Sequence, residues 1–262
     1  MIIYKSENEI EAIRRSCQIV AKVLYELGEM IRPGIKTKEL DLYAEKRAEE
    51  MGAIPAFKGY RGYPSSLCTS VNEVIVHGIP SSYALKEGDI ISLDFGVLFD
   101  GYYGDAAITY PVGKVSPLAM RLITTAEESF FKGIEKMKEG GRISDISHAI
   151  QECVEKRGFS VIRHFCGHGI GLSLHEEPQL PNFGLPGRGP IIKRGLVLAI
   201  EPMISAGDWH VRILEDNWTA ITKDRSLAAH YEHTVALTKY GVEILSEMEE
   251  RRVSFPKENQ YA

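Results

Sequence analysis

The sequence predicts an α+β fold in which two similar halves pack around one shared site. The main observation is an internal repeat. Each half has two helical segments, then His-Gly-Ile, then Lys-x-Gly and an apolar strand that ends in an acid. Asp94 and Glu201 each follow the glycine of their Lys-x-Gly sequence by six residues. Because the features recur in the same order, we expect one pseudo-symmetric domain, residues 1–246, with halves at about 5–112 and 113–246.

Four amphipathic helices are expected. The first begins with the capping box Ser6-x-x-Glu9 and ends at Arg32-Pro33-Gly34. The other helices cover residues 37–52, 117–138 and 144–157. The expected strands are residues 66–76 (a strand or a hairpin), 160–165 and 195–200, with further strands through Leu237. Residues 177–190 are expected to form a loop, and residues 247–262 a frayed or disordered polar tail.

The stretch from Lys86 to Thr109 is expected to form a hairpin. Its first strand is apolar enough for a core strand but contains Asp94. Asp100-Gly101 is a typical two-residue turn, in which both positions need a positive φ. With this turn, the numbers of two residues that face each other across the hairpin add up to 201, so Asp105 lies opposite Gly96. Asp94 is then the diagonal neighbour of Asp105 on the same face. Taken alone, this pair fits an exposed face with two solvated acids equally well.

The repeat adds two acids to this pair, because Glu201 matches Asp94 and Glu232 matches Asp105. Four carboxylates cannot all stay ionised on an apolar sheet without cations, and one divalent ion would leave them unbalanced. We therefore expect two metal ions bridged by carboxylates, with Mn, Fe(II), Co or Zn as candidates. Such a pair acidifies a bridging water and supplies hydroxide, which favours hydrolysis of a carbonyl or phosphoryl group.

Composition argues against several other classes. The 262-residue chain has a formal charge of −5, so no basic excess points to a nucleic acid or an anionic membrane. The sequence contains no signal peptide and no apolar run of bilayer length, which predicts a cytoplasmic protein without a membrane partner. The four cysteines form no Cys-x-x-Cys pair, which argues against a structural zinc site and a disulfide framework.

Five motifs carry a resemblance to a known family: Asp94 with Asp105, Cys-Gly-His168-Gly-Ile-Gly, His175-Glu-Glu-Pro, Glu201-Pro-Met and Tyr-Glu232-His-Thr. From about residue 5 to residue 245, the chain resembles type I methionine aminopeptidases. The resemblance implies the pita-bread (creatinase/aminopeptidase-like) fold, in which helices cover antiparallel sheets around a dinuclear metal site. The ligands that it implies are Asp94 for one ion, Asp105 and Glu232 for both, and His168 and Glu201 for the second.

The same resemblance implies that His175 contacts the scissile amide and steadies the tetrahedral intermediate, while His77 lines the substrate channel. A bridging hydroxide would attack the carbonyl after the initiator methionine of a nascent polypeptide whose second residue is small, and Glu201 would relay a proton. The methionine side chain would contact Tyr60, Tyr63, Cys68, Leu174 and Trp218. Leu174 and Phe57 depart from the residues common in the family, which affects the expected shape of this pocket.

Length separates the related classes. Only 24 residues lie between Glu176 and Glu201, too few for the helical insertion of the type II enzymes. No zinc-binding cysteines precede the domain, so we expect the minimal bacterial form. Two alternatives stay open: a proline-specific aminopeptidase of the same fold, and a non-catalytic binding module, which usually lacks several ligands. We expect a monomer, and association with ribosomes is left open.

The remaining histidines are assigned no part in the site. His148 lies in an expected helix, and three others match no motif: His164, His210 and His230. His233 follows Glu232 directly and would therefore point to the opposite face of a strand.

Overall fold

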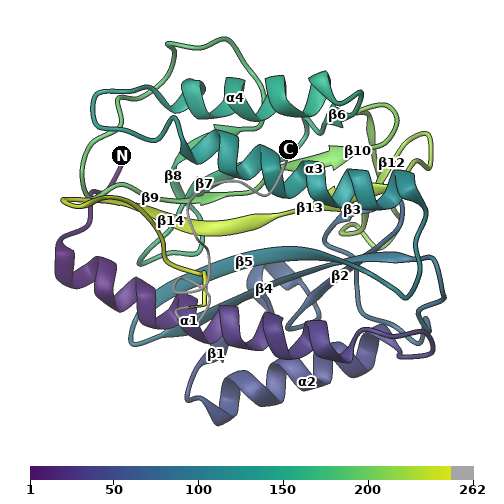
Figure 1. Ribbon diagram of the computed structural model, residues 1–262. Coiled ribbons are helices and arrows are strands. Elements are labelled where there is room, and N and C mark those ends of the chain that lie inside the picture. Colours follow the sequence, from purple (N-terminus) through teal and green to yellow (C-terminus); the bar gives the residue numbers. More distant parts are fainter. Residues whose placement is uncertain (249–262) are drawn as a thin grey trace.

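The computed structural model describes residues 1–248 (Figure 1). The helices are α1 (Glu7–Met30), α2 (Thr37–Glu50), α3 (Pro117–Ile134) and α4 (Ile143–Lys156), with a 3-10 turn at Tyr60–Gly62. The strands of the first half are β1 (Ile54–Pro55), β2 (Cys68–Val71), β3 (Val74–Val76), β4 (Ile90–Phe99) and β5 (Tyr102–Pro111). Those of the second half are β6 (Ser160–Val161), β7 (Cys166–Gly169), β8 (Glu176–Pro181), β9 (Val197–Ile200), β10 (Met203–Ser205), β11 (Val211–Ile213), β12 (Ala220–Thr222), β13 (Ala228–His230), β14 (Glu232–Thr238) and β15 (Gly241–Ile244).

The first helix begins and packs as its sequence predicts. The Ser6 side chain accepts a hydrogen bond from the Glu9 backbone N–H, and the Glu9 carboxylate accepts one from the Ser6 backbone N–H. The apolar face of α1 then packs against β4 and β5 in one buried cluster. Gly104 permits this close approach, because a Cβ there would lie 2.6 Å from the backbone nitrogen of Cys17. The helix therefore supports the hairpin from one side.

The two halves share one antiparallel sheet. Within residues 1–248 it has nine strands, in the order β1-β4-β5-β14-β9-β7-β8, with β2 beside β4 and β15 beside β14. The hairpin β4–β5 belongs to the first half, and β9 with β14 forms its counterpart in the second. In Figure 1, α1 and α2 lie below these strands and α3 and α4 above them. The predicted α+β fold with a pseudo-twofold repeat is confirmed.

One part of the sequence repeat does not mark equivalent positions. β2 pairs with β4 as β7 pairs with β9, so β2 and β7 are counterparts. His168 lies within β7, whereas His77 follows β3 and has a φ of 60°. Matching the two His-Gly-Ile sequences is therefore wrong as a structural equivalence, although both histidines line the same pocket.

Three strands differ from the prediction. β8 overlaps the stretch predicted as a loop, and β15 follows Leu237. Of the strand predicted over residues 160–165, only the first two residues form a strand, β6, and β7 begins after it at Cys166. β8 and β15 are outer strands that pair with β7 and β14. Proline in β8 and glycine at the start of β15 disfavour a strand locally, so these strands depend on their pairing partners. Residues 66–76 contain two short strands, β2 and β3, but these do not form a hairpin, because β2 pairs with β4 and β3 pairs with β12 in a separate sheet. Most of the predicted polar tail, residues 249–262, lies outside the described residues.

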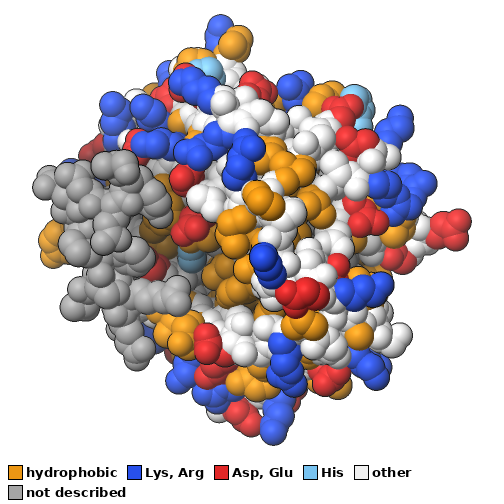
Figure 2. Space-filling model, turned by 45° about the vertical axis from the view of Figure 1, so that its right-hand side comes forward, with side chains coloured by type: hydrophobic (Ala, Val, Ile, Leu, Met, Phe, Trp, Pro, Cys, Tyr) orange, Lys and Arg blue, Asp and Glu red, His pale blue; other side chains and the backbone are white. Residues whose placement is uncertain are grey.

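The surface gives little further indication of a partner. Within residues 1–248, no helix combines the length and the apolar character needed to cross a membrane. Figure 2 shows basic and acidic side chains around the rim of one face, with hydrophobic side chains gathered toward its middle.

Candidate active site

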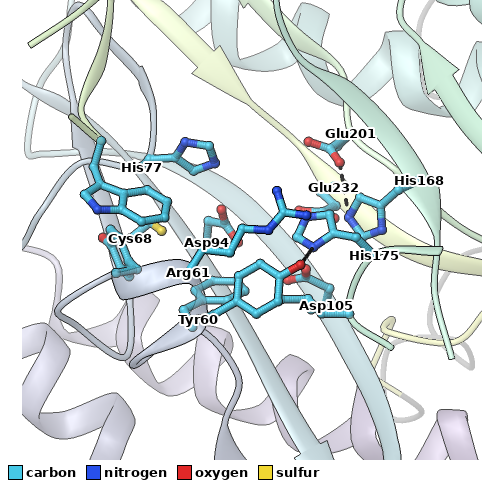
Figure 3. A pocket seen from close by; sticks show the side chains of 14 residues that line it. Tyr60, Arg61, Cys68, His77, Asp94, Asp105, His168, His175, Glu201 and Glu232 are labelled. Atoms are coloured by element: carbon cyan, nitrogen blue, oxygen red, sulfur yellow. Dashed lines mark hydrogen bonds and ion pairs between the residues drawn. The ribbon is translucent and has the colours of Figure 1, made fainter. Parts of the chain in front are cut away.

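Five neighbouring strands bring metal-ligating side chains to the middle of the sheet. Asp94 lies on β4, Asp105 on β5, Glu232 on β14, Glu201 directly after β9, and His168 on β7. The register aligns them, because Asp94 pairs with Ala107 and Ala107 pairs with Glu232. Paired residues of antiparallel strands share a face, so the side chains converge. Figure 3 shows the carboxylates grouped around the centre of the pocket, with the histidines beside them.

The predicted turn and register of the hairpin are confirmed. Asp100 and Gly101 have φ angles of 49° and 81°, and Gly96 pairs with Asp105. A Cβ at Gly96 would lie 3.2 Å from Oδ1 of Asp105, so glycine leaves room for the carboxylate. Across the sheet, the Thr234 hydroxyl donates to the Asp105 carbonyl at 2.8 Å. Gly96 on one neighbouring strand and Thr234 on the other therefore fix the position of Asp105.

Burial raises the pKa of every carboxylate in the cluster, and repulsion by neighbouring carboxylates raises the pKa further at Asp105, Glu201 and Glu232. Burial raises the pKa of Asp94 to about 7. The pKa of Asp105 is raised well above its usual value by burial and by the charge of Asp94. Burial and neighbouring carboxylates raise the pKa values of Glu201 and Glu232 in the same direction. The four groups therefore resist full ionisation unless cations compensate them.

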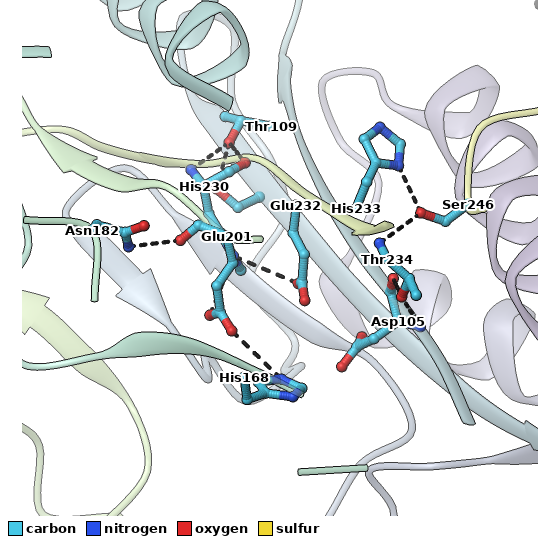
Figure 4. Close-up of polar contacts among 11 residues, drawn as sticks. Asp105, Thr109, His168, Asn182, Glu201, His230, Glu232, His233, Thr234 and Ser246 are labelled. Carbon is cyan, nitrogen blue, oxygen red and sulfur yellow. Dashed lines mark hydrogen bonds and ion pairs between the residues drawn. The ribbon is translucent and has the colours of Figure 1, made fainter. Parts of the chain in front are cut away.

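His168 is held so that one ring nitrogen faces the carboxylates. Its Nδ1 lies 2.9 Å from the carbonyl oxygen of Gly169, and because a carbonyl only accepts, Nδ1 must carry the proton. Burial lowers the pKa of His168 to about 4, so the ring is neutral at pH 7 and Nε2 holds a lone pair. This Nε2 lies 3.5 Å from Oε1 of Glu201 (Figure 4). A nitrogen lone pair and a carboxylate oxygen that face each other can together hold a cation.

Divalent metal ions fit this set of donors. Oδ1 of Asp94 and Oδ1 of Asp105 are buried and, among the described residues, have no hydrogen-bond partner. Two overlapping groups have ligand atoms within 4.8 Å of one another: Asp94, His230 and Glu232, and Asp105, His168 and Glu232. Sets of carboxylate and imidazole ligands suit Mn, Fe, Co and Zn. The groups share Glu232, as expected for two ions bridged by a carboxylate.

Two further histidines lie at the edge of the cluster. Nδ1 of His175 lies 2.8 Å from the Tyr60 hydroxyl, and its ring centroid lies 4.3 Å from that of His168. His77 stands edge-on to the rings of Phe165 and Trp218, at centroid distances of 5.4 and 6.1 Å. Burial lowers the pKa of His175 to about 3 and that of His77 to about 4. Both rings are therefore neutral at pH 7 and can donate a hydrogen bond without carrying a charge.

One pocket contains all the site residues that the sequence predicts: Tyr60, Tyr63, Cys68, His77, Asp94, Asp105, His168, Leu174, His175, Glu201, Trp218 and Glu232. Its apolar side also includes Phe57. The structure adds Arg61, whose guanidinium lies 5.4 Å from the centre of the Tyr60 ring. Sequence reasoning missed Arg61, and its only signal was its place in a segment rich in glycine and aromatic residues.

The sequence interpretation left His230 as a structural or surface residue, and the structure shows it buried beside the carboxylate cluster. His230 is 1% exposed, and its Nε2 lies 3.7 Å from Oε2 of Glu232 and 3.9 Å from Oε2 of Glu201. The sequence feature that could have predicted this position is the spacing to Glu232. Residues two apart on an extended chain share a face, and His230 stands two residues before Glu232. The interpretation of His233 is confirmed: its ring points away from the cluster and bonds Ser246 at 2.8 Å (Figure 4).

An antiparallel sheet that gathers carboxylates and imidazoles at the base of a partly apolar pocket defines a metal-dependent hydrolase. Residues 11–239 match metallopeptidase family M24, and the chain belongs to this family.

Relatives from several bacteria agree with the predicted resemblance. The chain is 53% identical to methionine aminopeptidase of Clostridium perfringens, over 94% of this chain and 99% of that protein. It is 52% identical to methionine aminopeptidase 1 of Bacillus subtilis, with the same coverage. The crystal structure of methionine aminopeptidase from Thermotoga maritima has a TM-score of 0.93 and 46% identity, covering 94% of this chain and all of that one. The resemblance to bacterial type I methionine aminopeptidases and the pita-bread fold are confirmed.

The likeness of the chain to a proline-specific peptidase is weaker. Prolidase from Pyrococcus furiosus has a TM-score of 0.75 and 25% identity, covering 94% of this chain but 66% of that one. The two proteins share the fold, and the main prediction is favoured over the proline-specific alternative.

Proposed function

We propose that the protein removes the initiator methionine from the N-terminal peptides of nascent proteins when the second residue is small. The observation that carries this proposal is the cluster of four carboxylates, two of them buried and two half-buried, with His168 at the base of a pocket that has an apolar side. The relatives named methionine aminopeptidase support it.

We assign the metal ligands as the sequence predicted: Asp94 to one ion, His168 and Glu201 to the other, and Asp105 and Glu232 to both. When bound, two divalent ions neutralise these carboxylates, polarise the scissile carbonyl and lower the pKa of water. The buried oxygens of Asp94 and Asp105 without hydrogen-bond partners support the assignment. Mn, Fe(II), Co and Zn all suit the donors, so the choice of ion is left to experiment.

Two residues are assigned to proton handling and charge stabilisation. Glu201 accepts the proton of the attacking water and passes it to the leaving amine, a role that suits a carboxyl whose pKa is raised. His175 donates from Nε2 to the oxygen of the scissile carbonyl as negative charge develops there. The Tyr60 hydroxyl on Nδ1 supports this role, because a hydroxyl that donates to Nδ1 leaves the ring proton on Nε2.

The apolar side of the pocket is assigned to the methionine side chain. Tyr63, Cys68 and Leu174 are each buried and belong to one hydrophobic cluster, against which Trp218 packs. An unbranched thioether side chain fits such a surface, because it is flexible and makes favourable contacts with aromatic rings. His77 lines the same pocket edge-on to Trp218 and is assigned to bind the peptide backbone.

We further propose that the protein acts in the cytoplasm, where initiator methionine is exposed, as a monomer and near ribosomes. The test is hydrolysis of a Met-Gly peptide compared with an Xaa-Pro peptide by the metal-loaded full chain. Release of methionine from the first alone is the expected result. Cleavage of the Xaa-Pro peptide alone would replace the proposal with the proline-specific alternative, and cleavage of neither, in a folded and metal-loaded protein, would favour a binding module.

A further inference from the structure

His230 is placed among the candidate ligands, but no role has yet been given to it. It ends β13, and the next residues begin β14, which carries Glu232. Its backbone is fixed on both sides by Thr109, whose hydroxyl donates to the His230 carbonyl at 2.7 Å and accepts from the His230 N–H at 2.9 Å. The Thr109 hydroxyl also contacts the Ser92 hydroxyl at 2.8 Å. The backbone of His230 is therefore fixed by the sheet, and the residue is 1% exposed.

The His230 side chain is buried and lacks a partner. Both ring nitrogens are inaccessible to solvent, and within residues 1–248 neither has a hydrogen-bond partner. The distances from Nε2 to Glu232 and Glu201, 3.7 and 3.9 Å, are longer than a hydrogen bond. Buried polar nitrogens without partners are rare in folded proteins, so a missing group is expected next to this ring.

The same distances suit two ligands of one cation. Two atoms that each lie about 2.1 Å from an ion are about 3 Å apart at a right angle and about 4 Å apart on opposite sides. The Nε2–Oε2 separation of 3.7 Å between His230 and Glu232 falls within this range. Ligand atoms of Asp94, His230 and Glu232 also lie within 4.8 Å of one another. Figure 4 shows the His230 ring behind Glu201, on the side of Glu232 away from His233.

We propose that His230 is a direct ligand, through Nε2, of the metal ion held by Asp94 and Glu232. The proposed ligand set otherwise gives that ion only carboxylates, while the second ion has His168. With His230, each of the two ions has one imidazole. A nitrogen ligand favours Fe, Co or Zn over Mn at the first position, because imidazole suits the former ions and carboxylate suits Mn. This inference rests on the proposed metal centre but not on the peptide that the protein cleaves.

The test is cobalt binding by the metal-stripped full chain, followed by calorimetry and by proton NMR of the Co²⁺-loaded protein. Wild-type protein should bind two ions and show hyperfine-shifted ring N–H signals from two histidines. His168→Ala should remove one signal and His230→Ala the other. His230→Ala should also weaken binding of one ion by more than about 100-fold, beyond the 10–100-fold loss typical of residues that only orient a ligand.

Two further variants separate ligation from other roles. His230→Gln keeps hydrogen-bonding groups in a side chain of similar length but is a poor ligand, so it should show the same loss as His230→Ala. The exposed His210, which pairs with Asp208, supplies the matched control, and His210→Ala should bind both ions as wild type does. Wild-type affinity in His230→Gln, or a single histidine signal in the wild-type protein, would overturn the proposal. The wild-type spectrum decides it even if both His230 variants fail to fold. Methionine release is not measured, so failure here is distinct from failure of the proposed function.

Discussion

The hydroxyl oxygen of Tyr60 lies 2.8 Å from Nδ1 of His175, and the two rings stack with their centroids 5.2 Å apart. Tyr60 belongs to the 3-10 turn in the first half of the chain, whereas His175 immediately precedes β8 in the second. The contact therefore joins the two halves at the mouth of the pocket. When the hydroxyl donates to Nδ1, the ring proton of His175 stands on Nε2, and the contact then links the packing of the halves to the chemistry of the site.

Removing this hydroxyl should slow the reaction without removing the metal. Tyr60→Phe keeps the stacked ring but no longer fixes the His175 tautomer, so kcat should fall by about 10-fold with metal content unchanged. His175→Ala removes the proposed donor itself and should lower kcat by about 100-fold or more. Steady-state kinetics with metal analysis of each sample would check both values. A loss of metal in His175→Ala would instead make that residue a ligand.

Asp105→Asn should lower metal occupancy and activity together. The amide keeps the shape of the side chain but removes the charge that is proposed to bridge both ions. The metal-free variant should be at least as stable as the metal-free wild type, because burial and Asp94 disfavour the Asp105 carboxylate. Metal analysis, activity and thermal unfolding of the stripped proteins are the measurements. Two bound ions and full activity in the variant would remove Asp105 from the bridge.

Metal affinity should rise with pH through about 7. Ions bind the deprotonated carboxylates, and in the metal-free protein burial raises the pKa of Asp94 to about 7. Below this pH a proton must leave before an ion binds, so affinity falls as pH falls, and Asp105, Glu201 and Glu232 act in the same direction. Calorimetric titration with Co²⁺ at pH ~6 and pH ~8, in buffers of different ionisation enthalpy, measures affinity and proton release. Equal metal affinity at both pH values, with no proton release on binding, would contradict the predicted pH dependence.

Leu174→Phe should change the preference for the N-terminal residue. Leu174 is 2% exposed and packs in the cluster that contains Tyr63 and Cys68, so a larger ring must fill pocket space or displace its neighbours. Turnover of N-terminal methionine should fall more than turnover of a smaller residue. Leu172→Phe is the matched control, because Leu172 is 54% exposed and does not line the pocket. An unchanged substrate profile in Leu174→Phe would remove this residue from the specificity pocket.

The parts of the fold that follow local rules could be predicted from the sequence. Asp100-Gly101 takes positive φ at both positions, and that turn alone sets the register that makes Asp94 and Asp105 diagonal neighbours. The capping residues of α1 act locally in the same way. The repeat then predicted Glu201 and Glu232, because their strands are counterparts of this hairpin.

The errors have one physical cause, since they concern residues placed by distant partners. β8 contains two prolines, which argue against a strand, and it forms where it pairs with β7. His230 is fixed by Thr109, which is 121 residues away in sequence. The second His-Gly-Ile sequence looked equivalent to the first, but strand pairing places His77 after β3. Local patterns in a single sequence do not show which distant segments pair, so they do not predict where these residues lie.

The most direct test of the central claim is methionine release from a Met-Gly-Met-Met peptide by metal-stripped protein, with Mn, Fe(II), Co or Zn added back singly. The stripped protein should release none, and at least one ion should restore release. The same peptide with a bulky second residue should remain uncut. Release of methionine without added metal would contradict a metal-dependent methionine aminopeptidase. So would a folded protein that binds two ions but releases no methionine with any of them.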